Sequence, residues 1–325
     1  MRAVRLSEHG GTEVLETTET DRPEPGGHEL LVEVAAAGVN PVDTYFRDGS
    51  YTPAELPFTP GVDVAGTVAA VGEFVDGFEV GDRVFGTGIG NGTFQGAYAE
   101  YATVPEDRVV HLPDGADLTE AGGAGVVAGT AWRALVDHAA LDPAEYCLIH
   151  GGSGGVGHAA VQIADHVGAE VYATASSDEK LDYARDIGAD HTINYETEEF
   201  DAAIKEATGN RGVDVVVDHI GAETWQQSLR SLARGGRLVT CGATTGPHPE
   251  TDINRIFWNQ LEVIGSTMGT PGEVDDVLGL VWDGTFEPRI REVLPMSETA
   301  RGHELLEERE GFGKVVLKPD SAYNE

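Results

Sequence analysis

Short runs of alternating apolar and polar residues dominate the first third of the chain. Leu30, Val32 and Val34 alternate with other residues, and so do Val62 and Val64. This period of two is typical of half-buried β-strands. Gly- and Pro-rich turns separate these runs, and helical periodicity is scarce before residue 117. The pattern predicts a β domain in this part of the chain.

After residue 117 the pattern changes to alternating helices and strands. A helix is predicted over residues 119–140, where apolar and small residues recur at helical spacing. The predicted strands that follow are residues 146–151, 171–176, 191–195, 213–221, 237–242 and 261–267, and the helices between them are 155–168, 178–188, 198–208 and 223–233. Repeated strand-helix-strand units indicate a parallel, doubly wound sheet covered by helices on both faces. The predicted fold class is therefore α/β. Towards the C-terminal end we expect two more helices, residues 273–284 and 298–308, and a last strand, 314–319.

A glycine-rich segment, GGSGGVG, separates a predicted strand from a predicted helix. It contains the spacing G-x-G-x-x-G, which in this context is a dinucleotide-binding fingerprint. The glycines let the backbone approach a pyrophosphate, whose charge is met by N–H groups at the helix N-terminus. A phosphate loop of the NTPase kind needs Lys after the last Gly, where this chain has His158. The predicted cofactor-binding residues in this loop are Gly152, Ser153, Gly154, Gly155, Val156 and Gly157.

The end of the second strand of this unit predicts which dinucleotide binds. An NAD enzyme usually places Asp or Glu there to bind the ribose 2′-OH, but this chain has Ala175. Ser176 and Lys180 would instead admit and neutralise a 2′-phosphate, which favours NADPH. Asp178 and Glu179 keep NAD as an alternative cofactor. Either residue would cap a helix, or it would repel the 2′-phosphate of NADPH.

Longer motifs follow one another along nearly the whole chain. They are AAAGVNPVDTYFRDGSY, PGVDVAGTVAAVG, GDRVFG, GAYAEY, GTAWRAL, SGGVGHAAVQIA, DHIG, GGRLVTCG and FGKVVL. In this order they resemble the zinc-free quinone oxidoreductases of the zeta-crystallin type, within the medium-chain dehydrogenase/reductase superfamily. The resemblance implies a GroES-like domain of residues 1–121 and 262–325, with a Rossmann domain of residues 122–261 inserted in it.

Departures from the zinc-dependent members of that superfamily bear on the chemistry. Those enzymes typically take zinc ligands from a Cys and a His in segments where this chain has Asn40 and Val62, and it has no Cys before Cys147. Without thiolate and imidazole ligands at these positions we expect no metal site. His158 and His166 lie on one predicted helix without a third ligand, and we expect them to be surface residues rather than zinc ligands. Losing a Lewis acid disfavours simple alcohols and favours conjugated acceptors such as a quinone or an α,β-unsaturated carbonyl.

The resemblance implies NADPH-dependent transfer of hydride to a quinone. Asn40, Tyr45 and Tyr51 are carried over as hydrogen-bond donors to the acceptor, since the chain keeps the family's Asn-Pro-x-(Asp/Glu)-x-Tyr-x-Arg-x-Gly-x-Tyr pattern. One alternative is an NADPH-dependent alkenal or enoyl reductase that acts on a C=C bond, and another is a non-enzymatic NADPH-binding protein. A homodimer is a further expectation from the family.

Other cofactor contacts follow from the same resemblance. A threonine near the nicotinamide ribose matches Thr130, and a residue beside the 2′-phosphate matches Tyr195. Segments that line the family's cleft contain the remaining candidates, Gly242, Ser266 and Lys314.

The charge of the chain limits its partners. It has 56 acidic and 21 basic side chains, for a formal net charge of −35. Such a protein repels phosphate backbones and anionic lipids, so we expect no nucleic-acid and no membrane partner. The same excess predicts a surface adapted to molar salt, as in halophiles, with ordinary acidic character as the alternative. An anionic cofactor then requires a less acidic cleft, with Lys180, Lys314 and the loop amides kept at the cofactor.

The cysteines and the N-terminal segment bear on the compartment. Cys147 and Cys241 form no disulfide framework or CxxC clip, and no apolar stretch that could serve as a signal peptide begins the chain. These features predict a cytoplasmic protein. The small-molecule substrate, a quinone or an enone, is what the family resemblance implies.

Overall fold

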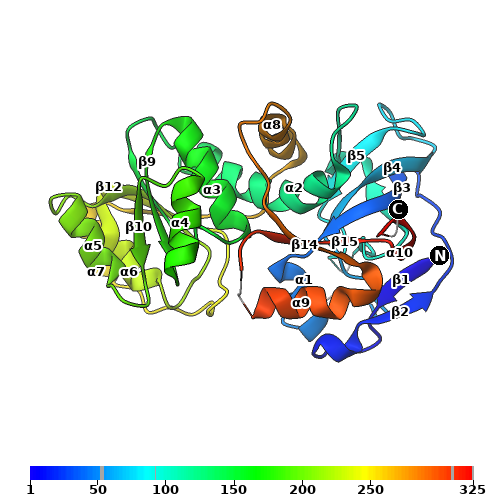
Figure 1. Cartoon of the computed structure of the whole chain (residues 1–325), viewed down its shortest axis with the longest axis horizontal. Helices are drawn as coiled ribbons and strands as arrows, with labels where there is room; N and C mark the ends of the chain where they lie inside the picture. The colour runs from blue at the N-terminus through cyan, green and yellow to red at the C-terminus, as the bar shows by residue number, and fades with distance from the viewer. Residues whose placement is uncertain (52–54, 92, 309–310, 324–325) are drawn as a thin grey trace.

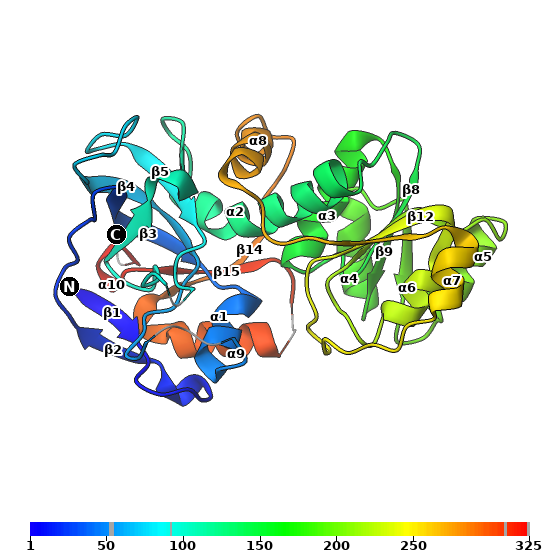
Figure 2. The same ribbon diagram turned by 180° about the vertical axis from the view of Figure 1, so that it is seen from behind.

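A computed structural model of the chain describes residues 1–51, 55–91, 93–308 and 311–323. Figure 1 shows two β-sheets towards opposite ends of an elongated molecule, with helix α2 (Leu118–Trp132) running between them. The view from behind shows the same division and places α1 (Pro41–Asp48) beside α9 (Thr299–Glu307) (Figure 2). Among the described residues, no helix is long and apolar enough to cross a membrane.

One sheet is parallel and, within the described residues, has six strands in the order β10-β9-β8-β11-β12-β13. Numbered along the chain this is 3-2-1-4-5-6, the order of a dinucleotide-binding doubly wound sheet. Its strands are β8 (Tyr146–Ile149), β9 (Glu170–Ala175), β10 (His191–Asn194), β11 (Val213–Asp218), β12 (Leu232–Thr240) and β13 (Glu262–Gly265). The connecting helices are α3 (Gly155–Val167), α4 (Asp178–Asp186), α5 (Phe200–Ala207), α6 (Trp225–Ser231) and α7 (Ile253–Asn259). The predicted α/β fold class is confirmed.

The other sheet joins both ends of the chain. Its strand order is β14-β15-β3-β4-β5-β7, and β6 pairs with β3 outside that path. Its strands are β3 (Glu29–Gly38), β4 (Asp63–Val71), β5 (Arg83–Thr87), β6 (Tyr101–Pro105), β7 (Val109–His111), β14 (Ile290–Pro295) and β15 (Lys314–Lys318). Strands β1 (Arg2–Arg5) and β2 (Glu16–Glu19) form a separate antiparallel pair. The C-terminal strand β15 pairs antiparallel with β3, which brings the two chain ends into one GroES-like unit.

Two predicted boundaries need correction. The division after residue 261 separates β13 from its sheet, because β13 pairs in parallel with β12 over Glu262 to Gly265. The division after residue 121 falls inside α2, which packs against both β3 and α3. The helix predicted to residue 140 is α-helical only to Trp132 and continues as a π-helical segment, Arg133–His138.

Several short helices were not evident from periodicity. The pattern indicated little helix before residue 117, yet α1 occupies Pro41–Asp48, where Asn40 and Asp43 form a capping box. Helix α7 and the terminal α10 (Asp320–Tyr323) were also not predicted. The predicted helix over residues 273–284 is α8 (Pro271–Trp282), which packs on α2.

Helix α2 approaches the strands closely because glycines replace side chains on its buried face. A Cβ on Gly122 would lie 2.9 Å from that of Ala36, and one on Gly125 would collide with the ring of Phe85. Buried residues of α2 therefore belong to a core that continues from the GroES-like sheet to α3 and β8. This shared core holds the two sheets in a fixed relation on either side of a cleft.

Candidate active site

A cavity of about 670 Å³ lies between the two sheets. One wall is the carboxyl ends of β8, β9 and β11, where ligands bind in doubly wound sheets. The opposite wall comes from α1, α9 and the start of β15. Its lining contains nine of the predicted site residues, namely Tyr45, Ser153, Gly154, Gly155, Val156, Ser176, Lys180, Tyr195 and Lys314.

The glycine-rich loop divides its glycines between packing and cavity lining. Gly152 and Gly157 do not line the cavity: a Cβ on Gly152 would lie 2.9 Å from that of Ala173, and one on Gly157 would collide with the Gly151 carbonyl. The Gly154 N–H donates to Gly151 O at 2.8 Å, so this amide is already used. The amides of Gly155 and the residue after it begin α3, where no earlier helical carbonyl can accept from them.

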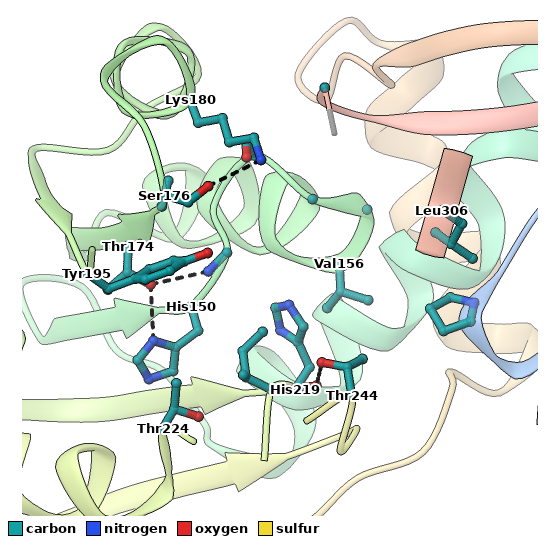
Figure 3. Close-up of a pocket in the computed structure, with 18 of the residues that line it drawn as sticks. His150, Val156, Thr174, Ser176, Lys180, Tyr195, His219, Thr224, Thr244 and Leu306 are labelled. Carbon is teal, nitrogen blue, oxygen red and sulfur yellow. Dashed lines mark hydrogen bonds between the residues drawn. The ribbon is translucent and has the colours of Figure 1, made fainter. Parts of the chain in front are cut away.

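At the end of β9 the side chains are small or cationic. Ala175 is buried, and Lys180 Nζ donates to Ser176 Oγ at 3.3 Å (Figure 3). The cap of α4 is Ser177, whose hydroxyl accepts from the Lys180 N–H at 3.4 Å. The two acidic residues that follow the cap, in the first turn of α4, are exposed and do not line the cavity. Neither Asp178 nor Glu179 is therefore part of the cavity wall. The preference for NADPH over NADH stays a prediction.

A directed series of hydrogen bonds begins at residues that line this part of the cavity, Gly151, Thr174 and His150. The Gly151 N–H donates to Thr174 Oγ1 at 3.3 Å, and Thr174 Oγ1 lies 3.1 Å from His150 Nδ1 (Figure 3). His150 Nε2 lies 2.9 Å from Ser228 Oγ, which donates to Asp218 Oδ2 at 2.8 Å. With that direction, His150 carries its proton on Nε2, and burial lowers its pKa and keeps it neutral. This series of hydrogen bonds was not predicted from the sequence, although His150 directly precedes the glycine-rich loop.

A second buried network joins the start of α1 to β15. Lys314 Nζ donates to Asn40 Oδ1 at 2.6 Å and to Val39 O at 2.5 Å. Asn40 Nδ2 donates to Asp63 Oδ2 at 2.8 Å and to Gly38 O at 3.3 Å. Both amide hydrogens of Asn40 are thus used inside the protein, and Asn40 does not line the cavity. This corrects its predicted role as a donor to the acceptor, because its geometry instead holds Lys314 at the cavity wall.

Two buried carboxyls accompany Lys314. Asp43 accepts from the Asn40 N–H at 2.9 Å and from Tyr98 Oη at 2.9 Å. Burial raises the pKa of Asp43 to about 6 and that of Asp63 to about 7, and the Lys314 ammonium opposes both shifts. Asp43 and Asp63 were not among the predicted site residues, although both lie within motifs that carry the family resemblance.

Tyr45 and Tyr51 lie together at one side of the site. Tyr45 lines the cavity, and its ring centroid is 5.3 Å from that of Tyr51 in an edge-to-face arrangement. Tyr51 is 53% exposed and is not among the lining residues. Residues 52–54, which follow it, lie outside the described residues.

Besides Gly152 and Gly157, three further predicted cofactor contacts do not line the cavity. The Thr130 hydroxyl donates to Val126 O at 2.6 Å, within α2. Ser266 Oγ donates to Thr267 O at 3.3 Å, and a Cβ on Gly242 would meet His219 O at 3.0 Å. The two hydroxyls are therefore bonded to nearby carbonyls, and Gly242 packs against the backbone of His219. Near these positions the cavity is lined instead by Val127, His219 and Thr244.

The cavity lining carries both basic and acidic side chains. Its cations are Lys180, Arg291 and Lys314. Its carboxylates are Asp48, Glu196, Glu198, Glu199, Glu223 and Glu307. Six carboxylates therefore face three cations in the cavity lining, compared with 56 acidic and 21 basic side chains in the whole chain. The lining is acidic, but in a lower proportion than the chain as a whole.

His158 is not the surface residue that its helical position suggested. It is fully buried, with Nδ1 2.9 Å from Gly155 O, and Nε2 accepts from the Arg289 N–H at 3.2 Å. Burial lowers its pKa to about 4. His158 thus fastens α3 to the segment that leads into β14.

The donor atoms at the superfamily's catalytic zinc position do not fit zinc. Val62 is apolar and buried, and Asn40 is engaged as described above. Within residues 1–51, 55–91, 93–308 and 311–323, no group of three or more His, Cys, Asp and Glu side chains is arranged to hold a metal ion.

Comparisons with known proteins agree with this architecture. Residues 26–114 match the alcohol dehydrogenase GroES-like domain family, and residues 155–283 match the zinc-binding dehydrogenase family. A quinone oxidoreductase from Lama guanicoe is 37% identical over 98% of this chain and 97% of its own. The structure titled Escherichia coli quinone oxidoreductase complexed with NADPH has a TM-score of 0.91 at 30% identity, covering 98% of this chain and all (100%) of that one. One titled NAD-dependent alcohol dehydrogenase has a TM-score of 0.93 at 36% identity, covering 98% and 99%. The chain belongs to the medium-chain dehydrogenase/reductase superfamily of oxidoreductases, in its quinone oxidoreductase-like group.

Proposed function

We propose that this protein reduces quinones with NADPH and without zinc. The observation that carries the proposal is the corner of the cavity at the end of β9, where Ser176 and Lys180 line the wall and Ala175 replaces the usual carboxylate. The curated relatives named quinone oxidoreductase and the NADPH complex of the Escherichia coli protein support it.

The cavity residues divide the binding of such a cofactor among them. Amides at the start of α3 would bind the diphosphate, and Lys180 and Ser176 would hold the 2′-phosphate. Lys314 adds positive charge at the opposite wall. The bound dinucleotide would supply a hydride. A quinone takes up that hydride and one proton to become a hydroquinone, and Tyr45 and cavity water are the two candidate proton sources.

The test is a substrate panel with NADPH and NADH in molar KCl. We expect oxidation of NADPH by quinones to exceed that by alkenals and enoyl compounds. Faster reduction of C=C substrates would favour the alkenal or enoyl reductase instead. If the protein binds NADPH but no acceptor oxidises it, a non-enzymatic binding protein is the remaining interpretation.

Replacing Lys180 with alanine is expected to raise the dissociation constant for NADPH by about tenfold or more, the worth of a charge-assisted hydrogen bond. The dissociation constant for NADH, which has no 2′-phosphate, is expected to change little. Isothermal titration calorimetry with both cofactors measures the two values. Lys205→Ala is the matched control, since Lys205 lies on α5 and does not line the cavity. Equal weakening for both cofactors would contradict the phosphate assignment.

We also propose that two copies associate through the edge of the parallel sheet. Strand β13 is at that edge, and Val263 on it is exposed, as are Phe257 and Trp258 on α7. An unpaired strand edge beside exposed aromatic side chains is unfavourable in water. We expect Trp258→Glu to convert a dimer into a monomer of 34.4 kDa in light scattering after gel filtration. Phe74→Glu, an exposed Phe in the GroES-like half, is the control, and a wild-type protein of monomer mass would exclude this assembly.

A further inference from the structure

The segment Gly311–Gly313 connects the two halves across the cavity. It lies between α9 and β15, and the ring of Phe312 stacks on that of Tyr183 in α4. The two ring centroids are 5.1 Å apart and their planes differ by 13°. Tyr183 and Phe312 are both half-buried. A nearly parallel contact of this kind holds α4 against the C-terminal part of the GroES-like unit.

The glycines on either side of Phe312 make this contact possible. Gly311 has φ +69° and Gly313 has φ +81°, conformations that residues with a Cβ rarely adopt. A Cβ on Gly311 would lie 2.8 Å from Arg291 Nε, and one on Gly313 would collide with Arg289. The backbone therefore turns tightly on both sides of the ring and presents it to α4.

The same segment is also fastened to the glycine-rich loop. The Gly313 N–H donates to Ser153 O at 3.1 Å. Gly311, Gly313 and Ser153 all line the cavity. The segment thus has two attachments to the Rossmann half: Gly313 is bonded to the glycine-rich loop, and Phe312 is stacked on α4.

Tyr183 lies one helical turn after Lys180. Residues three apart on a helix are neighbours on its surface, so the ring that contacts Phe312 belongs to the turn that carries Lys180. The position of that turn decides where the Lys180 ammonium stands relative to Ser176, to which it donates. A contact that fixes Tyr183 therefore also fixes Lys180.

We propose that Phe312, through its stack on Tyr183, is a positioning residue for recognition of the 2′-phosphate and so for the choice of NADPH over NADH. This rests on the proposed function, since it assumes that Lys180 binds that phosphate. Phe312 need not touch the cofactor: it holds the helical turn whose lysine does.

The experiment is calorimetric titration of wild-type protein and of Phe312→Ala with NADPH and with NADH. Loss of the stack is expected to raise the dissociation constant for NADPH by about two- to tenfold. The dissociation constant for NADH should rise by a smaller factor than that for NADPH. Tyr183→Ala should give the same pattern, whereas Phe312→Tyr and Tyr183→Phe, which keep both rings, should retain the wild-type ratio. Amide hydrogen exchange of the ligand-free Phe312→Ala protein should be faster in α4.

Phe74→Ala is the control, because it removes an aromatic contact with His28 away from the cavity. If Phe312→Ala weakens both cofactors equally while Lys180→Ala weakens only NADPH, the segment has a general structural role and the inference is wrong. If Lys180→Ala leaves the ratio of the two constants unchanged, the 2′-phosphate assignment fails, and this inference fails with it. Unequal weakening by Tyr183→Ala and Phe312→Ala would also contradict the shared contact.

Discussion

Replacing Lys314 with methionine is expected to lower the free energy of unfolding by about 3–5 kcal/mol at pH 8, the usual result of removing one partner from a buried charged network. Lys314 is 4% exposed, and its ammonium favours the charged forms of Asp43 and Asp63. Methionine has a similar length but no charge, so both carboxyls would stay buried without this cation.

The loss of unfolding free energy in Lys314→Met should be larger at high pH than at low pH. Burial raises the pKa of Asp63 from its ordinary value of 3.8 to about 7, so the folded state keeps a proton that the unfolded chain has released. Stability from such a group is complete below about pH 4 and is lost as the pH rises to about 7. Without Lys314 the pKa of Asp63 rises further, and the decline continues above pH 7. The penalty should therefore be smaller at pH 5 than at pH 8.

Urea unfolding in molar KCl at several pH values measures this difference. Lys318→Met is the matched control, because Lys318 is on the same strand, half-buried, and does not line the cavity. Asp63→Asn added to Lys314→Met should recover part of the lost stability, since it removes the uncompensated charge. Equal stability of Lys314→Met and wild-type protein at pH 8 would show that the cation is not needed.

Elements with a strong repeating pattern were the ones that the sequence predicted well. The parallel sheet follows from apolar runs alternating with amphipathic helices, and every predicted strand from residue 146 to 267 corresponds to a strand of that sheet. The prediction was weakest where a short element depends on caps or on distant partners. Helix α1 has too few turns for a clear period, and Asn40 and Asp43 define its start through hydrogen bonds.

The candidate site was predictable where the backbone itself lines the cavity. Ser153 to Val156, Ser176 and Lys180 meet there because β8 and β9 are adjacent parallel strands whose carboxyl ends share one edge. The role of Asn40 was not predictable. Its orientation depends on Lys314, which is 274 residues away in the chain, and on Asp63 at the start of β4. Nothing in the local sequence shows that both amide hydrogens are used inside the protein.

Raising KCl from 0.1 M to 2 M is expected to stabilise the protein and to strengthen NADPH binding. Both effects come from repulsion between carboxylates, which is strong when the Debye length is about 10 Å and weak when it is about 3 Å or less. The net charge of −35 opposes the compact state at low salt, so the thermal midpoint should rise with KCl. An equal midpoint at low and molar KCl would exclude salt adaptation.

The expected change in NADPH affinity has the opposite sign to ordinary phosphate binding. A site dominated by Lys and Arg loses affinity as salt screens its attraction. In this cavity the carboxylates outnumber the cations, and Glu196, Glu198 and Glu199 line it beside Tyr195. Screening should therefore remove more repulsion than attraction, and the dissociation constant for NADPH should fall, on the order of tenfold between the two salt concentrations.

Titration of cofactor fluorescence at stepped KCl concentrations measures this change. Glu196→Gln and Glu199→Gln together should lower the dissociation constant at 0.1 M KCl and flatten its dependence on salt. Glu24→Gln removes an exposed carboxylate that does not line the cavity and serves as the control. A dissociation constant that rises steadily with KCl would mean that Lys180, Arg291 and Lys314 dominate the field at the phosphates despite their smaller number. The sign of the salt dependence therefore decides whether the acidic lining acts on the cofactor or is compensated by the few cations placed against it.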